Sequence, residues 1–462
     1  MNNRRVFLNK ISALSASLFA GQTAVSAQQK SQAGMDQMDM SHGNAQHSTA
    51  PQVAGNARVT PVAVTPGSSV PVTTLDIGDL PFTMDNGVKV FHLIAEPVKQ
   101  VIVPGRTFDL WGFNGSAPGP TLQATEGDHV RIIFDNRLPE PTGVHWHGLE
   151  LPVEMDGVPG IGQKPVMPGE RFIYEFTLEQ NGTFFYHSHM AMQEMVGMLG
   201  GFIIHPKTPY APHVDKDFLI ALQEYSVLPN NSMPNSMDME FNWLTFNGKA
   251  GPASTPLVIR EGERVRIRFI NLGMDHHPIH LHGFTFWETG REAWRIPEPL
   301  WTRGNTVLVG VAQARDIEFI ARRTGDWMLH CHLPHHMMNQ MSSGVGSTRM
   351  TNGPLSQSEA DISMANNSMT NMRGMNHADM HAMETAKLPA NANQIPLFPQ
   401  DAFMEGPMMA MDKDVEKPEA YGLPSGWSGF VGGMMTLVRV LPADQYEKIM
   451  ALKSQQKASA AR

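Results

Sequence analysis

The stretch EGDHVRIIFDN, residues 126–136, returns almost unchanged as EGERVRIRFIN at residues 261–271. In both copies apolar and polar residues alternate, so that Val130, Ile132 and Phe134 would share one face of an extended chain. Alternation with a period of two residues is typical of a half-buried β-strand. The stretch therefore predicts a strand that occurs twice in one chain.

Three further landmarks repeat in the same order along the chain. The strand motif and one of these landmarks recur after 135 residues, and the last landmark recurs after 143. This nearly constant spacing predicts two copies of one β-sandwich domain, at residues 70–208 and 212–349. The repeated landmarks are FNGSAPGP and FNGKAGP (from Phe113 and Phe246), VHWHG and IHLHG (from Val144 and Ile279), and NGTFFYHSH and TGDWMLHCH (to His189 and His332).

Residues 1–27 have the features of an export signal. A basic start with Arg4 and Arg5 precedes a short apolar run and a small-residue cleavage site, AVSA, at residues 24–27. The paired arginines resemble the twin-arginine signal, and an ordinary secretory signal is the alternative. We therefore expect export to the periplasm or the exterior, with a mature chain that starts near Gln28.

Polar segments flank the repeat. Residues 28–69 and 350–392 contain methionine and histidine but little to bury, so we expect both to be disordered linkers. The C-terminal extension, residues 393–462, contains GFVGGMMTLVRVLP at 429–442, which predicts a strand. PADQYEKIMALK, at 442–453, predicts a short helix.

The composition limits what the protein binds. The net charge of −9 becomes −12 once residues 1–27, with three cations and no acid, are removed. This acidic balance disfavours nucleic acid and anionic membranes as partners. No run after the signal is long and apolar enough to span a bilayer. Cys331 is the sole cysteine, so no intrachain disulfide is expected.

Four His-x-His pairs occur at equivalent positions of the two repeats. Residues i and i+2 of a strand project from the same face, so each pair sets two imidazoles side by side. One pair alone is weak support for a metal site, whereas four matching pairs are hard to explain by packing. Imidazoles suit borderline transition metals, copper above all. The pairs are His145/His147, His187/His189, His280/His282 and His330/His332.

The stretch HCHLPHHMMNQM, residues 330–341, surrounds Cys331 with imidazoles and a thioether. A thiolate, imidazoles and a weak axial thioether make a blue-copper electron-transfer site. His336 and Met341 have suitable spacing from Cys331, and His277 of HPIHLH is well placed to supply the second imidazole. The first repeat lacks these ligands except for one methionine. The repeat offsets place Thr142, Ser188, Gln193 and Met198 opposite His277, Cys331, His336 and Met341.

The chain neighbours of Cys331 are His330 and His332. We expect both to serve another copper centre, so that an electron leaving the metal at Cys331 passes through the cysteine backbone into either histidine. The single cysteine is then both a ligand and the link between a one-electron site and oxygen chemistry.

With these motifs the chain resembles the multicopper oxidases, and among them the two-domain, laccase-like enzymes. HWHG, HSH, HPIHLHG and HCHLPHHMMNQM match the four copper motifs of the family in order, over roughly residues 75–349. The resemblance implies an all-β chain of two tandem cupredoxin-like Greek-key β-sandwich domains. It also implies oxidation of a reductant in one-electron steps and reduction of O2 to water.

The resemblance further implies four copper ions per chain-equivalent. Type 1 copper belongs to the second domain, type 2 copper takes one histidine from each domain, and the paired type 3 coppers take the remaining six. The implied ligands are His277, Cys331, His336 and axial Met341 for type 1; His145 and His280 for type 2; and His147, His187, His189, His282, His330 and His332 for type 3.

Two-domain relatives are homotrimers in which the trinuclear cluster lies between neighbouring subunits, and the same arrangement is implied here. His189 and His277 are only 88 residues apart, which leaves no room for a third sandwich of ~100 residues. Asp156, in EMDGVPG, matches a family acid near the trinuclear centre, which implies proton delivery. A turn-forming Asp-Gly pair is the alternative for Asp156.

The motifs do not encode the reductant. Methionine is common, 33 in total, with clusters at Met190–Met198 and Met364–Met383. Because thioethers favour Cu(I), cuprous ion is one candidate, as in periplasmic copper-tolerance oxidases. Phenols and aromatic amines are the other. Core filling and a plain linker are the alternatives for the two clusters.

Three other functions compete with an oxidase. A copper nitrite reductase shares the two-domain trimeric plan, but its type 1 cysteine lies in the first domain, where this chain has Ser188. A non-catalytic periplasmic protein for copper binding or storage would not need the complete ligand set. A zinc hydrolase gives the bridging cysteine no role.

Overall fold

The computed structural model describes residues 69–190, 192–227, 231–339 and 411–460. Several predicted features lie outside these residues: the export signal, nearly all of the first linker, the Met/His-rich linker and Met341.

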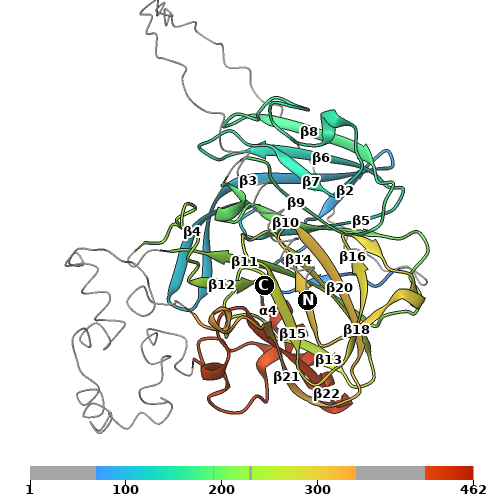
Figure 1. Ribbon diagram of the computed structural model, residues 1–462, viewed down its shortest axis with the longest axis vertical. Coiled ribbons are helices and arrows are strands. Elements are labelled where there is room, and N and C mark those ends of the chain that lie inside the picture. Colours follow the sequence, from blue (N-terminus) through green and yellow to red (C-terminus); the bar gives the residue numbers. More distant parts are fainter. Residues whose placement is uncertain (1–68, 191, 228–230, 340–410, 461–462) are drawn as a thin grey trace, which may run out of the picture. The chain divides into compact units, whose positions relative to one another are not determined.

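The first half of the described chain forms two sheets (Figure 1). One has the order β2-β3-β6-β8, with β4 paired to β3, and the other has the order β5-β10-β9-β7. Strands β3 and β6 are parallel, as are β5 and β10, whereas β9 is antiparallel to both its neighbours. The bounds are β2 Phe82–Asp85, β3 Val88–Val103, β4 Arg106–Phe113, β5 Gly119–Thr125, β6 His129–Asn136, β7 Val144–His147, β8 Arg171–Thr177, β9 Gly182–Ser188 and β10 Leu199–His205.

The second half repeats this connectivity. Strand β11 is parallel to β14, which is antiparallel to β20, and the sheet continues through β16 to β17. The other sheet has the order β13-β22-β21-β15-β19, in which β13 and β22 are parallel. The bounds are β1 Thr73–Thr74, β11 Lys216–Tyr225, β12 Trp243–Phe246, β13 Leu257–Arg260, β14 Arg264–Asn271, β15 His277–Leu281, β16 Phe286–Arg291, β17 Trp294–Arg295, β18 Thr302–Gly304, β19 Thr306–Val309, β20 Gln313–Ile320, β21 Gly325–Cys331 and β22 Met435–Leu441.

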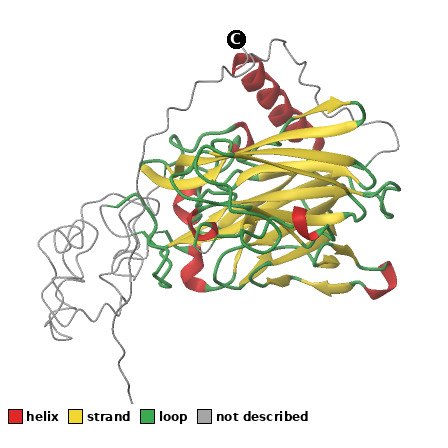
Figure 2. Ribbon diagram, turned by 90° about the horizontal axis from the view of Figure 1, so that it is seen from above, coloured by secondary structure: helices red, strands yellow, loops and turns green. Residues whose placement is uncertain are grey.

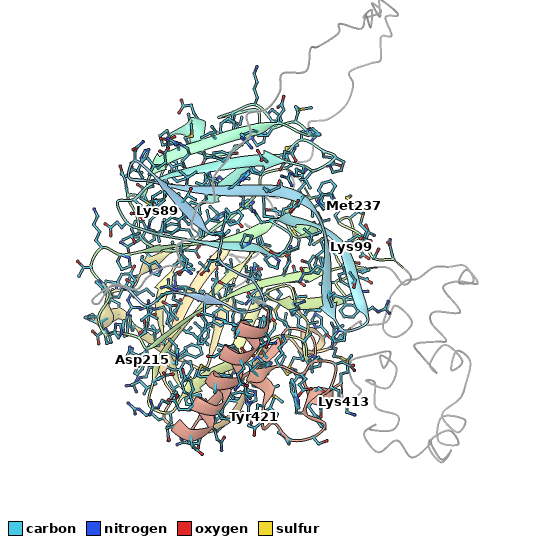
Figure 3. The ribbon with its side chains drawn as sticks, turned by 180° about the vertical axis from the view of Figure 1, so that it is seen from behind. Lys89, Lys99, Asp215, Met237, Lys413 and Tyr421 are labelled. Carbon is cyan, nitrogen blue, oxygen red and sulfur yellow. The ribbon has the colours of Figure 1, made fainter. Side chains whose placement is uncertain are left out.

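Helices are few (Figure 2). The expected C-terminal helix is present as α4, which contacts the η7 turn that precedes Tyr421 (Figure 3). No helix of the described ranges is long and apolar enough to cross a membrane. The bounds are η1 Val153–Met155, η2 Glu194–Val196, η3 Glu298–Leu300, η4 Pro334–Met337, η7 Pro418–Ala420, η8 Trp427–Phe430 and α4 Ala443–Ala460.

The repeated strand behaves as its pattern predicts in the first half. Along β6 buried and partly exposed residues alternate strictly, and Val130, Ile132 and Phe134 are fully buried. They pack in one apolar core, and the matching residues of β14 pack in a second core. The prediction of an all-β fold with two cupredoxin-like sandwiches is confirmed.

Strand β14 departs from the alternation because its other face is covered too. Arg266 and Arg268 are almost fully buried where the sheet packs against the first half. Arg268 donates to Asp217 at 2.8 Å and to the hydroxyl of Thr183, on β9, at 2.6 Å. Burial of a charge is tolerated when it is paired and hydrogen-bonded, and this network satisfies both conditions.

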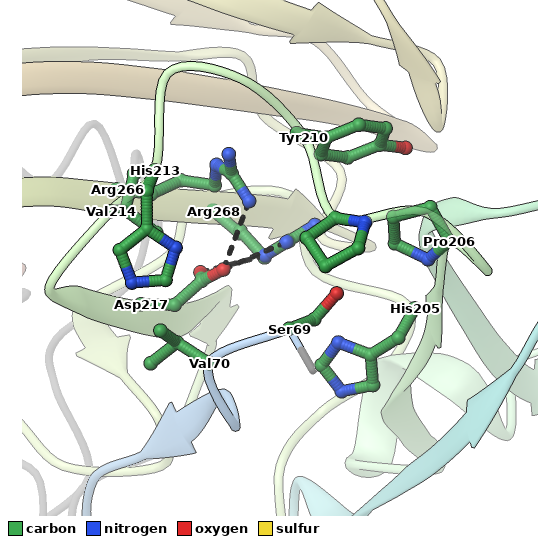
Figure 4. Close-up of a pocket in the computed structure, with 11 residues that line it drawn as sticks. Ser69, Val70, His205, Pro206, Tyr210, His213, Val214, Asp217, Arg266 and Arg268 are labelled. Atoms are coloured by element: carbon green, nitrogen blue, oxygen red, sulfur yellow. Dashed lines mark hydrogen bonds and ion pairs between the residues drawn. The ribbon is translucent and has the colours of Figure 1, made fainter. Parts of the chain in front are cut away.

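A small cavity adjoins this network. Figure 4 shows Asp217 between Arg266 and Arg268, with the ring of Tyr210 nearby; the Arg266 guanidinium lies 5.3 Å from the centre of that ring. The cavity measures about 20 Å³, which is room for one water molecule. Its size and its internally paired charges indicate a structural role.

Candidate metal centres

A thiol and two imidazoles meet in the second half, in a group that we call the sulfur site: His277, Cys331 and His336. His277 begins β15, Cys331 ends β21, His336 lies in η4, and none is more than 1 % exposed. Sγ of Cys331 lies 3.3 Å from Nδ1 of His336 and 3.7 Å from Nδ1 of His277. All three donor atoms lie within 4.8 Å of one another. Two nitrogens and one sulfur in this arrangement are the donor set of a blue-copper centre.

The outer nitrogens of both rings face carboxylates. Nε2 of His277 lies 3.1 Å from Oε2 of Glu224. The other oxygen of this carboxylate, Oε1, accepts hydrogen bonds from the backbone N–H groups of Met274 and Asp275. Nε2 of His336 lies 3.5 Å from Oδ2 of Asp275. A partner at one ring nitrogen decides which nitrogen is left for a metal. Both rings are therefore oriented to bind a metal through Nδ1.

The electrostatics of the sulfur site also fit a cation. Burial raises the pKa of the Cys331 thiol to about 12 and lowers the pKa of His336 to about 3, so both groups are neutral without a metal. Neutral imidazole is the ligating form of histidine, and a bound metal ion deprotonates a coordinating thiol outright. The residues present therefore fit copper.

The first half has a polar cluster where the second half has the sulfur site. Ser188 occupies in β9 the place of Cys331 in β21, because the β7–β9 and β15–β21 pairs have the same register. Its Oγ lies 3.1 Å from Oγ1 of Thr142 and donates to Oε1 of Gln193 at 2.7 Å. The three residues that the repeat offsets align with the sulfur site thus do meet, but as a hydrogen-bonded cluster without thiol or imidazole.

Four imidazoles gather on β7, on β9 and directly after β9, and form the first quartet: His145, His147, His187 and His189. The ring centre of His145 lies 5.3 Å from that of His187 and 5.4 Å from that of His189. Nδ1 of His145 donates to the carbonyl oxygen of Asp156 at 2.8 Å, which leaves Nε2 for a metal. The carboxylate of Asp156 lies 3.3 Å from the same Nδ1. Burial lowers the pKa of His147 to about 4, so it too stays neutral.

The second quartet, His280, His282, His330 and His332, repeats this geometry. The ring centre of His280 lies 5.6 Å from that of His330 and 5.3 Å from that of His332. Nδ1 of His280 donates to the carbonyl oxygen of Asn305 at 2.7 Å, as His145 does to Asp156. His145 and His280, which the family resemblance pairs as type 2 ligands, therefore share one tautomer and present the same nitrogen.

The two quartets are separate within one chain. Across the described ranges, ring contacts occur inside each quartet and none joins one quartet to the other. His189 and His332 are both exposed to solvent. A hollow of about 620 Å³ opens beside His280. Each quartet is thus a separate group of four histidines that reaches the surface through one exposed ring.

The structure describes eleven of the twelve predicted metal ligands, and all eleven lie in the sulfur site or a quartet. Met341 lies outside the described residues. Sequence reasoning missed Glu224, which is fully buried against His277. Its signal was an acid in the otherwise uncharged run FLIALQEY, residues 218–225.

The chain is similar to several curated proteins. The copper resistance protein A of Pseudomonas syringae pv. tomato is 36% identical over 147 residues, which are 32% of this chain and 24% of that protein. Laccase-2 of Botryotinia fuckeliana is 29% identical over 267 residues, which are 53% of this chain and 45% of that protein. The chain thus spans from about a quarter to about half the length of these curated relatives.

Among solved structures, the blue copper oxidase from Nitrosomonas europaea aligns with a TM-score of 0.51 and 30% identity, covering 55% of this chain and 82% of that one. Two family models, both described as multicopper oxidase, match residues 97–209 and 226–349, together just over half of the chain. The chain belongs to the multicopper oxidase family.

Proposed function

We propose that this protein oxidises a reductant in one-electron steps at the sulfur site and reduces O2 at a cluster built from the two quartets. Four electrons and four protons convert one O2 into two waters. One observation carries the proposal: Cys331 lies in the sulfur site, whereas its chain neighbours His330 and His332 lie in the second quartet. The cysteine backbone is a short covalent path between the two.

Four copper ions per chain-equivalent suit the ligands. Type 1 copper takes the sulfur site, type 2 takes His145 and His280, and the type 3 pair takes the other six histidines. When bound, the type 1 ion supplies a one-electron couple and the other three supply oxygen reduction. The matched hydrogen bonds from Nδ1 of His145 and His280 to carbonyl oxygens support their pairing at one ion.

Asp156 is our candidate for proton supply. Its backbone carbonyl orients His145, and its half-buried carboxylate lies at the edge of the first quartet, where protons are consumed. Replacement by asparagine keeps the backbone carbonyl and removes the titratable group. We therefore expect D156N to keep its copper and to reduce O2 slowly, which single-turnover reoxidation kinetics would measure.

A homotrimer would complete the cluster, with the first quartet of one subunit facing the second quartet of the next. The hollow beside His280 is lined by Arg303, Arg322 and Arg323, all exposed and without an ion pair among the described residues. Charge of this sign beside an incomplete metal site calls for an acidic partner surface.

The loop beside the first quartet offers an acidic surface of this kind. Glu150 and Glu154 are exposed next to Asp156, and the apolar side chain of Val153 between them is 53% exposed. Acidic residues around one exposed apolar side chain match an arginine-lined hollow in charge. Sedimentation of the copper-loaded protein should give three times the chain mass.

The reductant that we favour is Cu(I), with phenols and aromatic amines as the alternative. Met274 is 41% exposed beside Asp275, whose carboxylate faces His336. Three more exposed methionines lie at positions 233, 237 and 239, of which Figure 3 labels Met237. Thioethers prefer Cu(I), and two relatives are named copper resistance proteins. Met195 and Met198, by contrast, are buried and fill the core.

We also propose export to the periplasm, by the twin-arginine route, on the strength of residues 1–27. That route carries folded proteins, which suits a chain that binds its metal before it crosses the membrane. Fractionation of cells that express the full chain, with Arg4 and Arg5 replaced by lysine as the comparison, would test the route.

Two other functions are less well supported. A nitrite reductase needs its type 1 cysteine where Ser188 bonds to Thr142 and Gln193. A storage protein needs no covalent link between a mononuclear site and a cluster. Oxygen uptake by the copper-loaded protein distinguishes the three functions. An oxidase should take up oxygen with Cu(I) and with a phenol, and the C331S substitution should abolish this uptake. No uptake with either reductant would favour storage, and nitrite-dependent NO release would favour the reductase.

A further inference from the structure

We propose that Met434, rather than Met341, supplies the axial thioether of the sulfur site. The proposal rests on the proposed function, since an axial ligand has meaning only if the sulfur site holds copper. Spacing favours Met341, which lies ten residues after Cys331, as Met198 lies ten residues after Ser188. The backbone of the second half points to the other methionine.

The first argument is a hydrogen bond that both halves share. In the first half, the backbone N–H of Ser188 donates to the carbonyl oxygen of Met198 at 3.1 Å. In the second half, the N–H of Cys331 donates to the carbonyl oxygen of Met434 at 3.0 Å. Because Ser188 and Cys331 are equivalent, Met198 and Met434 are equivalent as well.

Strand register gives the same answer independently. His187 pairs with Leu199 across β9 and β10, and His330 pairs with Met435 across β21 and β22. Met198 directly precedes Leu199, and Met434 directly precedes Met435. Met434 is fully buried, and it belongs to the same apolar cluster as Cys331. Its backbone N–H also donates to the carbonyl oxygen of His336 at 2.8 Å.

A glycine precedes the methionine in both halves. Gly197 has φ 117° and Gly433 has φ 57°, a region that favours glycine, whereas Met341 follows Gln340. A Cβ on Gly433 would collide with the backbone carbonyl oxygen of His336. The Gly-Met pair therefore fits tightly against the loop that carries His336, in the way that only glycine allows.

Asn339 joins this loop to the Gly-Met pair. Its Oδ1 accepts from the N–H of Gly433 at 2.7 Å, and its Nδ2 donates to the carbonyl oxygen of Gly251 at 2.7 Å. The carbonyl oxygen of Gly433 in turn accepts from the N–H of Gly251 at 2.8 Å. Asn339 thus lies beside Gly433, which is 94 positions further along the chain, and Met434 takes the position that Met198 holds in the first half.

The test replaces each methionine and measures the type 1 copper directly. M434L and M434Q should move the reduction potential in opposite directions, upward for leucine and downward for glutamine, because the axial ligand tunes the couple. The type 1 electron paramagnetic resonance signal should change with them. M341L should leave both readouts at the wild-type values.

M198L is the matched control, since it makes the same change at the equivalent buried position without a metal. It should lower thermal stability at most and leave the type 1 spectrum unchanged. A spectrum and potential altered by M341L but not by the two Met434 variants would overturn the assignment. A wild-type protein that binds copper without any type 1 signal would instead overturn the proposed function, so the two failures are distinct.

Discussion

Oε2 of Glu224 lies 3.1 Å from Nε2 of His277, and neither side chain is exposed to solvent. Glu224 is held in turn by the backbone N–H groups of Met274 and Asp275, so its carboxylate cannot swing away without leaving donors unpaired. The pair fixes the ring of His277 with Nδ1 toward Cys331 and places a carboxylate behind a proposed metal ligand. Glu224 is thus a positioning residue for the sulfur site.

Replacing Glu224 by glutamine should raise the type 1 reduction potential. A buried carboxylate stabilises the more positive, oxidised state of the site, and the neutral amide does not. We expect a tenfold change in the equilibrium, or on the order of 60 mV for one electron. Redox titration followed by visible absorption measures it. D275N is the comparison: Asp275 is partly exposed and 3.5 Å from His336, so screening should make its shift smaller. Equal shifts for both variants would contradict the burial argument.

Charge reversal should dissociate the proposed trimer. R322E/R323E and E150K/E154K each set like charges against each other at the interface, so each should shift the protein toward monomer and lose oxygen uptake. The combined variant restores opposite charges and should recover part of both. Analytical ultracentrifugation gives the mass. K413E, on an exposed side chain, is the control and should stay trimeric. Trimers in all variants would exclude this interface.

Replacing Arg268 by methionine should destabilise the fold by ~3 kcal/mol, because it leaves the buried Asp217 with one cation, Arg266, instead of two. Denaturant unfolding of metal-free protein measures the loss. The matched control is R291M, which removes an exposed partner of Glu288 and should cost about 0–1 kcal/mol. Similar losses in both variants would mean that the network contributes no more than a surface pair.

Stability should fall between pH 6.5 and pH 4 in part through His205. Burial lowers its pKa to about 4 from the ordinary 6.5, and Nε2 lies 3.0 Å from Oε1 of Gln123. In this window the unfolded chain binds a proton at His205 and the folded chain does not, so acid favours unfolding. The measurement is the difference in thermal stability between H205Q, which cannot titrate, and the wild type. This difference should favour H205Q more at pH 5 than at pH 8. A difference between the two proteins that does not change with pH would contradict the assignment.

The sequence was sufficient for the fold and for the grouping of the histidines and Cys331, because both follow from short-range pattern. Alternation over 126–136 predicts a strand, and the repeat predicts a second domain of the same topology. The spacing of each His-x-His pair puts two rings on one face whatever surrounds the strand. Local geometry of this kind needs no knowledge of the rest of the chain.

Residues whose role depends on contacts far apart in the sequence could not be predicted from the local pattern. Glu224 stands out as an acid in an otherwise uncharged run, but it lies 53 positions from His277, and nothing near either residue indicates that the two are partners. The alternation predicts that Arg266 and Arg268 face solvent. In the structure the first half covers both side chains, and Asp217 pairs with them. Such burial depends on how the two halves pack, which residue order alone does not specify.

Two hydrogen bonds of the Asn339 side chain join the end of the loop that carries His336 to Gly433 and Gly251. Because the bond to Gly433 joins residues at the two ends of an interval of 94 positions, a change in the length of that interval leaves the bonded residues themselves unaltered.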